Sequence, residues 1–286
     1  MDGDDFLSGA NIAILGLGLM GGSLAMALKG RCASIRGVDA DDRVVSQALQ
    51  RNVVDMASSD PKAMLPAADL IILATPVGAI IDFIHALPAW HSGSAIVLDI
   101  GSTKAEITCA METLPDRFDP IGGHPMCGKE KSGLEYADAQ LFRGAAFAFT
   151  PLQRTSHRAR VACAQIAEAI GARPLWLDPA THDRWTAATS HIPYLAAIAL
   201  AAITPREAAP LVGPGFRSAT RLAASSTRMM RDILATNRQN VLAGLSGLIQ
   251  HLEQMEVLLA GSDDNALEAL LDFGLEQQKY LARSYL

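Results

Sequence analysis

Residues 121–133 carry side chains that could do chemistry at an unusual density. The imidazole of His124 is followed, with glycines between, by four polar side chains: Lys129, Glu130, Lys131 and Ser132. A neutral imidazole is a suitable general base near pH 7, and ammonium groups attract an anionic substrate. So many glycines, with Pro125 after the histidine, argue against a buried strand or a regular helix. We therefore expect a loop whose backbone approaches a ligand closely and in which Pro125 holds His124 rigidly.

Cysteine chemistry and metal binding are alternative interpretations of this segment. Cys127 lies close to His124 and could act as a nucleophile, but a thiol is activated only by a base within hydrogen-bond reach. The cysteines are scattered without a Cys-x-x-Cys pair: they are Cys32, Cys109, Cys127 and Cys163. This spacing favours free thiols in a reducing cytoplasm over disulfides or a metal cluster, so we expect no metal ion.

A second group of candidates forms a Gly-x-Gly-x-x-Gly motif at residues 16–21, between an apolar run at 11–15 and a helical pattern. In a dinucleotide-binding loop, Gly16 permits the tight turn, Gly18 admits the pyrophosphate and Gly21 lets helix and strand pack closely. The helix N-terminus then faces the phosphates, and the backbone there belongs to Leu19 and Met20. A glycine-rich turn without a ligand is the alternative.

The cofactor preference depends on Asp39, which follows the next predicted strand at residues 34–38. An acidic side chain at this place accepts hydrogen bonds from the adenosine ribose. Its charge would repel the 2′-phosphate of NADP, so the sequence predicts NAD in preference to NADP. Arg36 and Arg43 lie nearby and are the features that would suit NADP instead.

Two later apolar runs, at residues 68–74 and 95–100, also end in polar or turn residues. Because the carboxyl ends of parallel strands meet at the ligand crevice, we expect the following residues beside the cofactor: Thr75, Pro76 and Ser102. Ser102 and Lys104 are also candidates on the substrate side. The alternative role of Ser102 is an N-cap for a helix that begins near Thr103.

Further polar groups occur in the second half of the chain. His191 and Tyr194 lie at the start of an apolar helical pattern, and Arg217 and Arg221 are four residues apart, on one face of a helix. An arginine can hold a substrate carboxylate with two parallel hydrogen bonds. A surface salt bridge is the alternative for each arginine.

The elements that must position these residues change in kind near residue 152. Short apolar runs alternate with helical patterns before it, which predicts an α/β domain of Rossmann type over residues 1–152, with a parallel sheet covered on both faces. A helix at 157–170 and a short strand at 173–177 precede an all-helical remainder. We expect residues 153–286 to form a helical substrate-binding domain, whose surplus of leucine and alanine favours a homodimer over a monomer.

Composition excludes several classes of protein. A net charge of −6 over 286 residues argues against nucleic-acid binding. Apolar stretches such as residues 194–203 are too short to span a bilayer, and the acidic N-terminus is not a secretory signal. The sequence therefore predicts a cytoplasmic protein without membrane contact.

Taken together and in order, these motifs resemble those of the prephenate/arogenate dehydrogenases of tyrosine biosynthesis. The resemblance covers nearly the whole chain and rests on five segments: residues 16–23, 99–104, 123–133, 190–193 and 215–221. The segment around His124 is the most specific of them, and the first glycine motif is the least specific.

The resemblance implies NAD-dependent oxidative decarboxylation, in which hydride leaves C4 of a cyclohexadienol ring, the ring carboxylate leaves as CO2 and aromatisation drives the reaction. It implies that His124 accepts the proton of the C4 hydroxyl, and that Ser102 hydrogen bonds the same hydroxyl or orients His124. It further implies that Arg221 binds a substrate carboxylate and that Glu130 pairs with Arg221 as a gate. Tyrosine, which resembles the substrate, would inhibit at the active site.

The chain departs from the family pattern at positions that bear on the substrate. Tyr194 stands where many relatives carry a second histidine, Ser218 where many carry an aspartate, and Met230 where many carry an aromatic residue. The lack of an acidic group to bind the ammonium of arogenate favours prephenate. Arogenate dehydrogenase, or a cyclohexadienyl dehydrogenase of dual specificity, is the alternative.

Two other classes of protein are weighed against this family. Reductases of β-hydroxyacids or imines with a Rossmann domain generally place a catalytic lysine on the helical domain, and here Lys279 is the only lysine after Gly133. A protein that binds NAD and does no chemistry would not require His124, Ser102 and Arg221 to converge.

Overall fold

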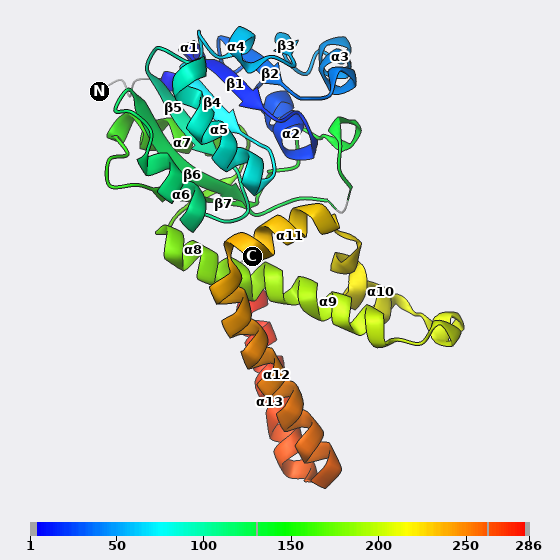
Figure 1. The fold of residues 1–286 in the computed structure, drawn as a ribbon. Helices are drawn as coiled ribbons and strands as arrows, with labels where there is room; N and C mark the ends of the chain where they lie inside the picture. The colour runs from blue at the N-terminus through cyan, green and yellow to red at the C-terminus, as the bar shows by residue number, and fades with distance from the viewer. Residues whose placement is uncertain (1–4, 130, 262, 284–286) are drawn as a thin grey trace. The chain divides into compact units, whose positions relative to one another are not determined.

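The computed structural model describes residues 5–129, 131–261 and 263–283 (Figure 1). Its contacts divide the chain into two units, Met1–Arg238 and Gln239–Leu286. The candidate site residues all belong to the first unit, and one of them, Glu130, lies outside the described residues. The structure therefore tests no part of the predicted pairing of Glu130 with Arg221.

A mixed sheet with the strand order β3-β2-β1-β4-β5-β6-β7-β8 forms the centre of the first unit. Its strands are β1 (Asn11–Leu15), β2 (Ser34–Val38), β3 (Met56–Ser58), β4 (Leu70–Leu73), β5 (Ala95–Asp99), β6 (Phe118–Pro125), β7 (Ala146–Pro151) and β8 (Arg173–Trp176). Neighbouring strands are parallel except β6 and β7, which are antiparallel. The predicted α/β class is confirmed.

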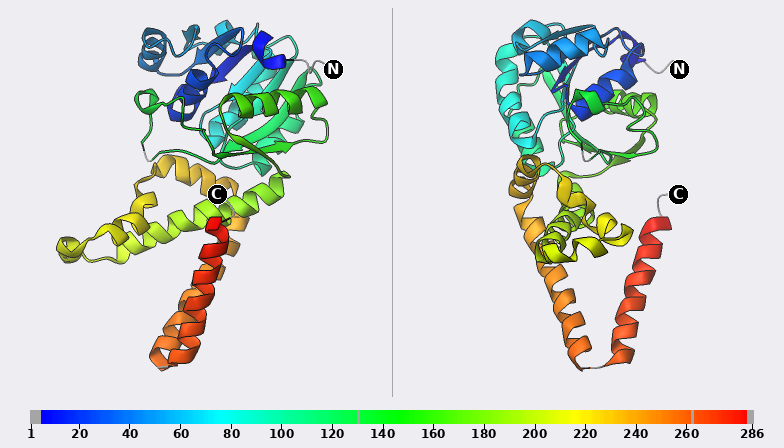
Figure 2. Two further views of the ribbon diagram at one scale, coloured as in Figure 1. Left: turned by 180° about the vertical axis from the view of Figure 1, so that it is seen from behind. Right: turned by 90° about the vertical axis from the view of Figure 1, so that its right-hand side faces the viewer.

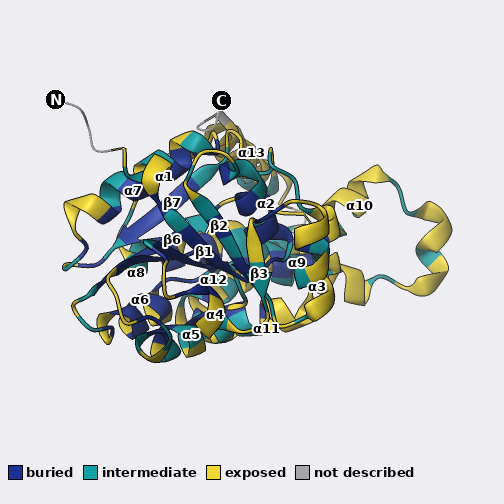
Figure 3. Ribbon diagram, turned by 90° about the horizontal axis from the view of Figure 1, so that it is seen from above, coloured by how far each residue is buried: buried dark blue, intermediate teal, exposed yellow. Residues whose placement is uncertain are grey.

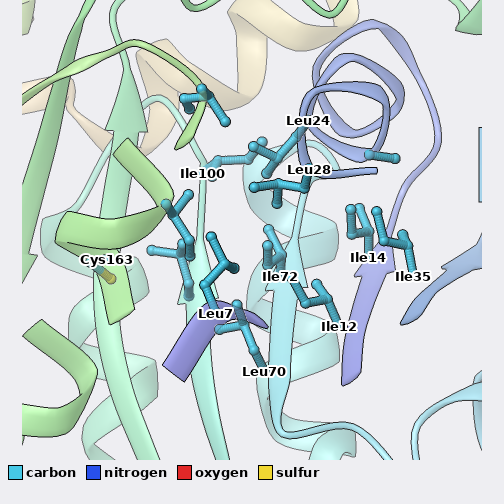
Figure 4. Packing of buried hydrophobic residues seen from close by; sticks show 14 of the residues in the cluster. Leu7, Ile12, Ile14, Leu24, Leu28, Ile35, Leu70, Ile72, Ile100 and Cys163 are labelled. Carbon is cyan, nitrogen blue, oxygen red and sulfur yellow. The ribbon is translucent and has the colours of Figure 1, made fainter. Parts of the chain in front are cut away.

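Helices cover both faces of the sheet because successive strand residues point to opposite sides. In β1, Ile12 and Ile14 belong to one buried cluster, whereas Ala13 and Leu15 belong to the other (Figure 4 shows the first cluster). The first cluster packs under α1 (Phe6–Gly9), α2 (Leu19–Leu28), α3 (Asp42–Gln50) and α7 (His157–Ala169). The second packs under α4 (Pro61–Met64), α5 (Val77–Trp90) and α6 (Ala105–Glu112) (Figure 2). Buried strands and exposed outer helix surfaces follow from this layering (Figure 3).

His124 lies in a strand, so the predicted loop is wrong up to Pro125, whereas residues 126–129 and 131–133 lie outside helices and strands. β6 extends to Pro125, and His124 pairs with Ala148 of the antiparallel β7. The two glycines before His124 are what allow the strand to lie here. A Cβ atom on Gly122 would come within 2.2 Å of Thr150 Oγ1, and one on Gly123 within 2.8 Å of the Asp99 carbonyl oxygen. The glycines thus serve close packing inside a sheet rather than a flexible loop.

The remaining chain is helical. It comprises α8 (Pro179–Thr186), a π-helical turn (Ala187–His191), α9 (Ile192–Ile203), a 3-10 helix (Arg206–Leu211), α10 (Pro214–Thr220), a second 3-10 helix (Arg221–Ala224), α11 (Thr227–Thr236), α12 (Arg238–Gly261) and α13 (Asp264–Arg283). Residues 218–236 do not form one continuous helix. The chain turns before α11, where Ser226 caps the new helix by accepting a hydrogen bond from the Met229 amide.

The sheet continues past residue 152, the predicted division between the domains. β8 pairs in parallel with β7, and α7 packs against the sheet between them. The short strand predicted at 173–177 is therefore the last strand of the sheet, and helix alone follows from Pro179 onward in the part of the chain that the structure describes.

The helical run Pro179–Ile203 is longer than the apolar stretch recognised in the sequence. Its 25 residues, with a mean hydropathy of 1.4 over an 18-residue window, would allow a membrane crossing by length and composition alone. Its first half, however, buries His182, Asp183 and His191, and the carboxylate of Asp183 bonds to α6. This run is therefore packed as an element of the first unit.

Candidate active site

The glycine motif forms a tight turn between β1 and α2. Gly16 has a φ of 96°, in the left-handed region that favours glycine. A Cβ atom there would come within 2.6 Å of the Ala74 carbonyl oxygen, and one on Gly21 within 1.9 Å of the Gly16 carbonyl oxygen. These contacts fit the predicted roles of the two glycines: Gly16 permits the tight turn, and Gly21 lets helix and strand pack closely.

Gly18 differs from these two glycines because a Cβ atom on it would meet open space. It is the N-cap of α2, and no side chain caps the helix, whose first residues are Leu19 and Met20. The N-terminus of α5, after Pro76, also lacks a side-chain cap, and the nearby Thr75 hydroxyl is buried without a hydrogen-bond partner. Free helix N-termini and an unsatisfied hydroxyl at neighbouring strand ends suit a phosphate-bearing cofactor.

Asp39 follows β2 beside the glycine loop. Its Oδ2 accepts a hydrogen bond from the Leu17 amide at 2.9 Å, and its Oδ1 accepts one from the Asp41 amide at 3.0 Å. Each carboxylate oxygen keeps a further lone pair for a ribose hydroxyl. Arg43 is paired with Asp41, 2.7 Å from Nη2 to Oδ2, so this guanidinium is already engaged by an acid. The residues present fit NAD.

A buried ion pair lies at the carboxyl edge of β5. Asp99 and Lys104 are both fully buried and form a short ion pair. The Asp99 carboxylate also accepts hydrogen bonds from the amides of Gly101, at 2.7 Å, and of Gly123, at 3.3 Å. Lys104 Nζ donates to the Gly123 carbonyl oxygen at 2.6 Å. This pair therefore ties the turn that carries Ser102 to the strand residue that precedes His124.

His124 is joined to the helical part of the chain through two residues that the sequence reasoning missed. His124 Nδ1 lies 3.0 Å from His182 Nε2, and His182 Nδ1 lies 2.8 Å from Asp183 Oδ1. The Asp183 carboxylate also accepts hydrogen bonds from the amides of Lys104, at 2.7 Å, and of Ala105, at 2.9 Å. Asp183 thus caps α6, and the alternative role of Ser102 as an N-cap is excluded because the helix begins later, at Ala105.

The environment of His124 keeps its imidazole neutral. Burial lowers the pKa of His124 well below 6.5, and the charges of His182, Lys104 and His191 act in the same direction. Burial also lowers the pKa of His191 to about 4, although the nearby Asp183 opposes the effect. In the ion pair, burial raises the pKa of Asp99 and lowers the pKa of Lys104. A neutral imidazole near pH 7 is able to accept a proton.

The polar side chains that follow His124 are engaged within their own segment. Lys129 Nζ lies 3.3 Å from Asp138 Oδ2, and Lys131 Nζ lies 4.9 Å from the centre of the Tyr136 ring. Ser132 is exposed. Burial raises the pKa of the Cys127 thiol to about 11, so this thiol is protonated near pH 7 and is not an activated nucleophile.

The predicted substrate residues of the second half lie on elements that pack together. His191 is buried, and its Nδ1 lies 3.3 Å from Asn237 Nδ2. Tyr194 is buried in the same cluster as Met230. Arg217 and Arg221 are exposed, Arg217 on α10 and Arg221 at the start of the 3-10 helix that packs against α9. The structure thus groups His124, His182 and His191, and it places Arg221 on a 3-10 helix that packs against α9, the helix that follows His191.

In the part of the chain that the structure describes, no group of three or more His, Cys, Asp or Glu residues is placed to hold a metal ion. A loop built for a dinucleotide and a neutral imidazole share one edge of a parallel sheet. A dehydrogenase needs both, because it must hold a nicotinamide cofactor and accept a proton from the hydroxyl that it oxidises. The chain is therefore built as a nicotinamide-dependent dehydrogenase.

Comparison with known proteins identifies the family. Residues 24–175 match the family described as "Prephenate dehydrogenase, nucleotide-binding domain", and residues 178–273 match "Prephenate dehydrogenase, dimerization domain". The prephenate dehydrogenase of Bacillus subtilis is 33% identical over 88% of this chain and 71% of its own length. The chain belongs to the prephenate dehydrogenase family, and it is an NAD-dependent oxidoreductase of that family.

Two further relatives match over almost their whole length. The cyclohexadienyl dehydrogenase of Zymomonas mobilis is 30% identical, with 94% of each chain covered. The crystal structure of the Aquifex aeolicus prephenate dehydrogenase in complex with hydroxyphenyl propionate and NAD+ superposes with a TM-score of 0.87. It is 29% identical and covers 96% of this chain and 99% of its own.

Proposed function

We propose that the protein catalyses the oxidative decarboxylation of prephenate to 4-hydroxyphenylpyruvate with NAD, a step of tyrosine biosynthesis. The observation that carries the proposal is the position of the His124 imidazole at the same sheet edge as the dinucleotide loop, where burial lowers its pKa. The family match and the relatives named prephenate dehydrogenase supply the substrate class.

The cofactor side is formed by the first two βα turns and the end of β4. We assign the phosphates to the backbone of the glycine turn and the ribose to Asp39. The assigned cofactor residues are Gly16, Gly18, Leu19, Met20, Gly21, Asp39, Thr75, Pro76 and Ser102. When bound there, NAD supplies the hydride acceptor.

The substrate side combines the sheet edge with the helical elements. His124 takes the proton of the C4 hydroxyl as C4 is oxidised, and Ser102 holds that hydroxyl or orients His124. Loss of CO2 from the ring leaves an electron pair on the phenolate oxygen, and the imidazolium of His124 returns the proton there. The overall reaction releases no proton. His124 therefore needs no proton exchange with water to complete a turnover.

Recognition of the two substrate carboxylates is assigned to the cationic and polar groups around His124. Arg221 would hold the side-chain carboxylate by a bidentate contact, with His191 and Tyr194 beside it. The remaining substrate assignments are Arg217, Lys129, Lys131, Ser132 and Glu130, and of these Glu130 lies outside the described residues. The contacts of Lys129 with Asp138 and of Lys131 with Tyr136 would have to open for a direct role.

Arogenate is the alternative substrate. The relative named cyclohexadienyl dehydrogenase keeps dual specificity open, and the exposed Ser218 on α10 provides no acidic partner for an ammonium group. Steady-state NADH production with prephenate and with arogenate, each with NAD and with NADP, tests the proposal. We expect the highest kcat/KM for prephenate with NAD. No turnover of either substrate would overturn the proposed function, and a preference for arogenate would replace it with the alternative.

The pH dependence of that reaction follows from the lowered pKa of His124. The base works in its neutral form, so a lowered pKa preserves activity to lower pH. We expect kcat/KM for prephenate to stay level as the pH falls from about 8 to about 6.5 and to decline only below the ordinary histidine value. A profile already falling at pH 7 would contradict a base whose pKa is lowered in this way.

Replacing Asp39 tests the ribose assignment. Asp39→Ala should raise KM for NAD about ten-fold or more and raise KM for NADP far less, because the carboxylate that repels a 2′-phosphate is removed together with the ribose contact. Asp42→Ala, which removes an exposed neighbouring carboxylate and leaves the pair of Asp41 and Arg43 in place, is the control. Equal losses for NAD and NADP in the Asp39 variant would remove the assignment.

We also propose that the helical region binds substrate and forms a homodimer, and that the enzyme is cytoplasmic. Large apolar side chains on α12 and α13 are exposed, which supports a covering second copy: they include Leu242, Leu252, Val257, Leu259, Leu271, Phe273, Tyr280 and Leu281. Sedimentation velocity at micromolar concentration tests the dimer, and sedimentation as a monomer would contradict it.

We also propose that tyrosine competes with the substrate at the active site. Unchanged rates of NADH production at saturating tyrosine would exclude this competition.

A further inference from the structure

A continuous chain of hydrogen bonds runs from β6 to α8. It consists of His124, His182 and Asp183, with 3.0 Å from His124 Nδ1 to His182 Nε2 and 2.8 Å from His182 Nδ1 to Asp183 Oδ1. His182 and Asp183 are each 1% exposed, so water does not compete for these bonds. Neither residue belongs to the motifs from which the substrate or cofactor assignments were made.

The direction of each bond is set by Asp183. Its two oxygens accept hydrogen bonds from the backbone amides of Lys104 and Ala105, which can only donate. A carboxylate with this many donors around it acts as an acceptor, so His182 Nδ1 carries the proton of the bond between them. With its proton on Nδ1, the imidazole of His182 presents the lone pair of Nε2, and His124 donates from Nδ1. Nε2 of His124 is thereby left unprotonated.

We propose that His182 and Asp183 are positioning residues that hold His124 in the tautomer whose basic atom is Nε2. The proposal rests on the proposed function, in which His124 accepts the proton of the substrate hydroxyl. Without these two hydrogen bonds, His124 could carry its proton on Nε2, and that nitrogen would then have no lone pair free to accept the substrate proton. With them, the imidazolium formed during the reaction keeps its Nδ1–H donating into His182, and the Asp183 charge stabilises that cation.

Asp183 also holds this hydrogen-bonded group in place against α6. Asp183 caps α6 directly after the turn that carries Ser102, and its carbonyl oxygen accepts a hydrogen bond from Asn237 Nδ2 at 2.7 Å. A replacement of Asp183 would therefore disturb a helix end as well as a tautomer. His182 contacts His124 and Asp183 through its ring and does not cap α6. Variants of His182 therefore test the positioning of His124 without removing the helix cap.

Two substitutions of equal polarity distinguish the two ring nitrogens of His182. In His182→Gln, the carboxamide lies where Nε2 was and its oxygen can still accept from His124 Nδ1. In His182→Asn, the shorter carboxamide lies where Nδ1 was and keeps only the contact with Asp183. We expect His182→Asn to lower kcat for prephenate about 10²-fold and His182→Gln to lower it less than about ten-fold, with KM for NAD unchanged in both. Equal rates in the two variants would overturn the proposal.

His91→Gln is the matched control, because it removes another buried imidazole, 3.0 Å from the Ala68 carbonyl oxygen. Its kcat should equal that of the original protein. A loss as large as that of His182→Asn would assign the effect to stability and overturn the positioning role.

The tautomer itself is measured without turnover. In the full-length protein labelled with ¹⁵N-histidine, we expect two-dimensional ¹H–¹⁵N spectra at neutral pH to show His124 protonated at Nδ1 and unprotonated at Nε2. The resonance is assigned by its loss in His124→Asn. Protonation at Nε2 would overturn the proposal even if prephenate is turned over. A protein with the expected tautomer that does not oxidise prephenate would contradict the proposed function alone.

Discussion

Replacing His124 with asparagine should lower kcat for prephenate by about 10²–10⁴-fold, the range that general base catalysis contributes, while NAD affinity stays unchanged. The asparagine amide can retain a donor toward His182, 3.0 Å from Nδ1 in the native protein, but provides no base for the substrate hydroxyl. Initial rates of NADH formation and calorimetric titration with NAD measure the two effects separately.

His85→Asn is the matched control for this variant, because His85 is exposed on α5 and away from the sheet edge. It should keep the full rate. Unchanged NADH production in the His124 variant would sink the assignment of the base, and a parallel loss of NAD affinity would mean that the substitution had disturbed the sheet edge itself.

The second large effect concerns stability. Lys104→Met should lower the free energy of unfolding by about 3–5 kcal/mol, because it leaves the fully buried Asp99 without its cation. Burial already raises the pKa of Asp99, and loss of the ammonium group raises it further. A group whose pKa is higher in the folded than in the unfolded state binds more protons when folded, so the variant should regain stability as the pH falls. Urea unfolding at pH 7 and at pH 5 measures both effects.

Lys29→Met provides the comparison for an accessible pair. Lys29 and Asp55 are 27% and 43% exposed, so breaking their ion pair should cost less than about 1 kcal/mol. Adding Asp99→Asn to Lys104→Met removes the buried charge and should recover part of the loss. If Lys104→Met and Lys29→Met were equally stable, the buried pair would not be holding the sheet edge together.

The parallel part of the sheet is predictable because its signals are local. The strands at residues 11–15 and 34–38 were predicted with the same bounds as β1 and β2, since each is a short apolar run ended by a turn. The glycine motif is equally local. Gly16 and Gly21 are required by contacts within one βα turn and with the neighbouring end of β4. In this region pattern and structure agree because each signal depends on residues close to it in sequence or at the neighbouring end of β4.

His124 shows why a local signal can mislead. Glycine is usually a sign of turns, but Gly122 and Gly123 lie in a strand because Thr150 and the Asp99 backbone approach too closely for any side chain. The partners come from β7 and β5, and the sequence pattern of β6 alone contains no information about either. His124 could therefore be singled out from the sequence as the candidate base, whereas the strand that holds it could not be predicted.

His182 and Asp183 could not be found from the sequence for a related reason. A histidine and an aspartate near the start of a helix are ordinary surface residues, and their importance arises from contacts with His124 and Lys104, far earlier in the chain. Asp178 lies just before them as the cap of α8, which accounts for one acidic residue but not for Asp183. A buried His–Asp pair is recognisable only once the fold has brought α8 to the sheet edge.

The cap that Asp183 provides for α6 has a consequence for the order of folding. The cofactor loop closes through Leu17 and Asp39, which are 22 residues apart, whereas the bond between Lys104 and Asp183 spans 79 residues. Closing the longer loop costs about 1 kcal/mol more in chain entropy. The nucleotide loop can therefore assemble while the catalytic edge is still open. A refolding molecule should regain the ability to bind NAD before it regains turnover.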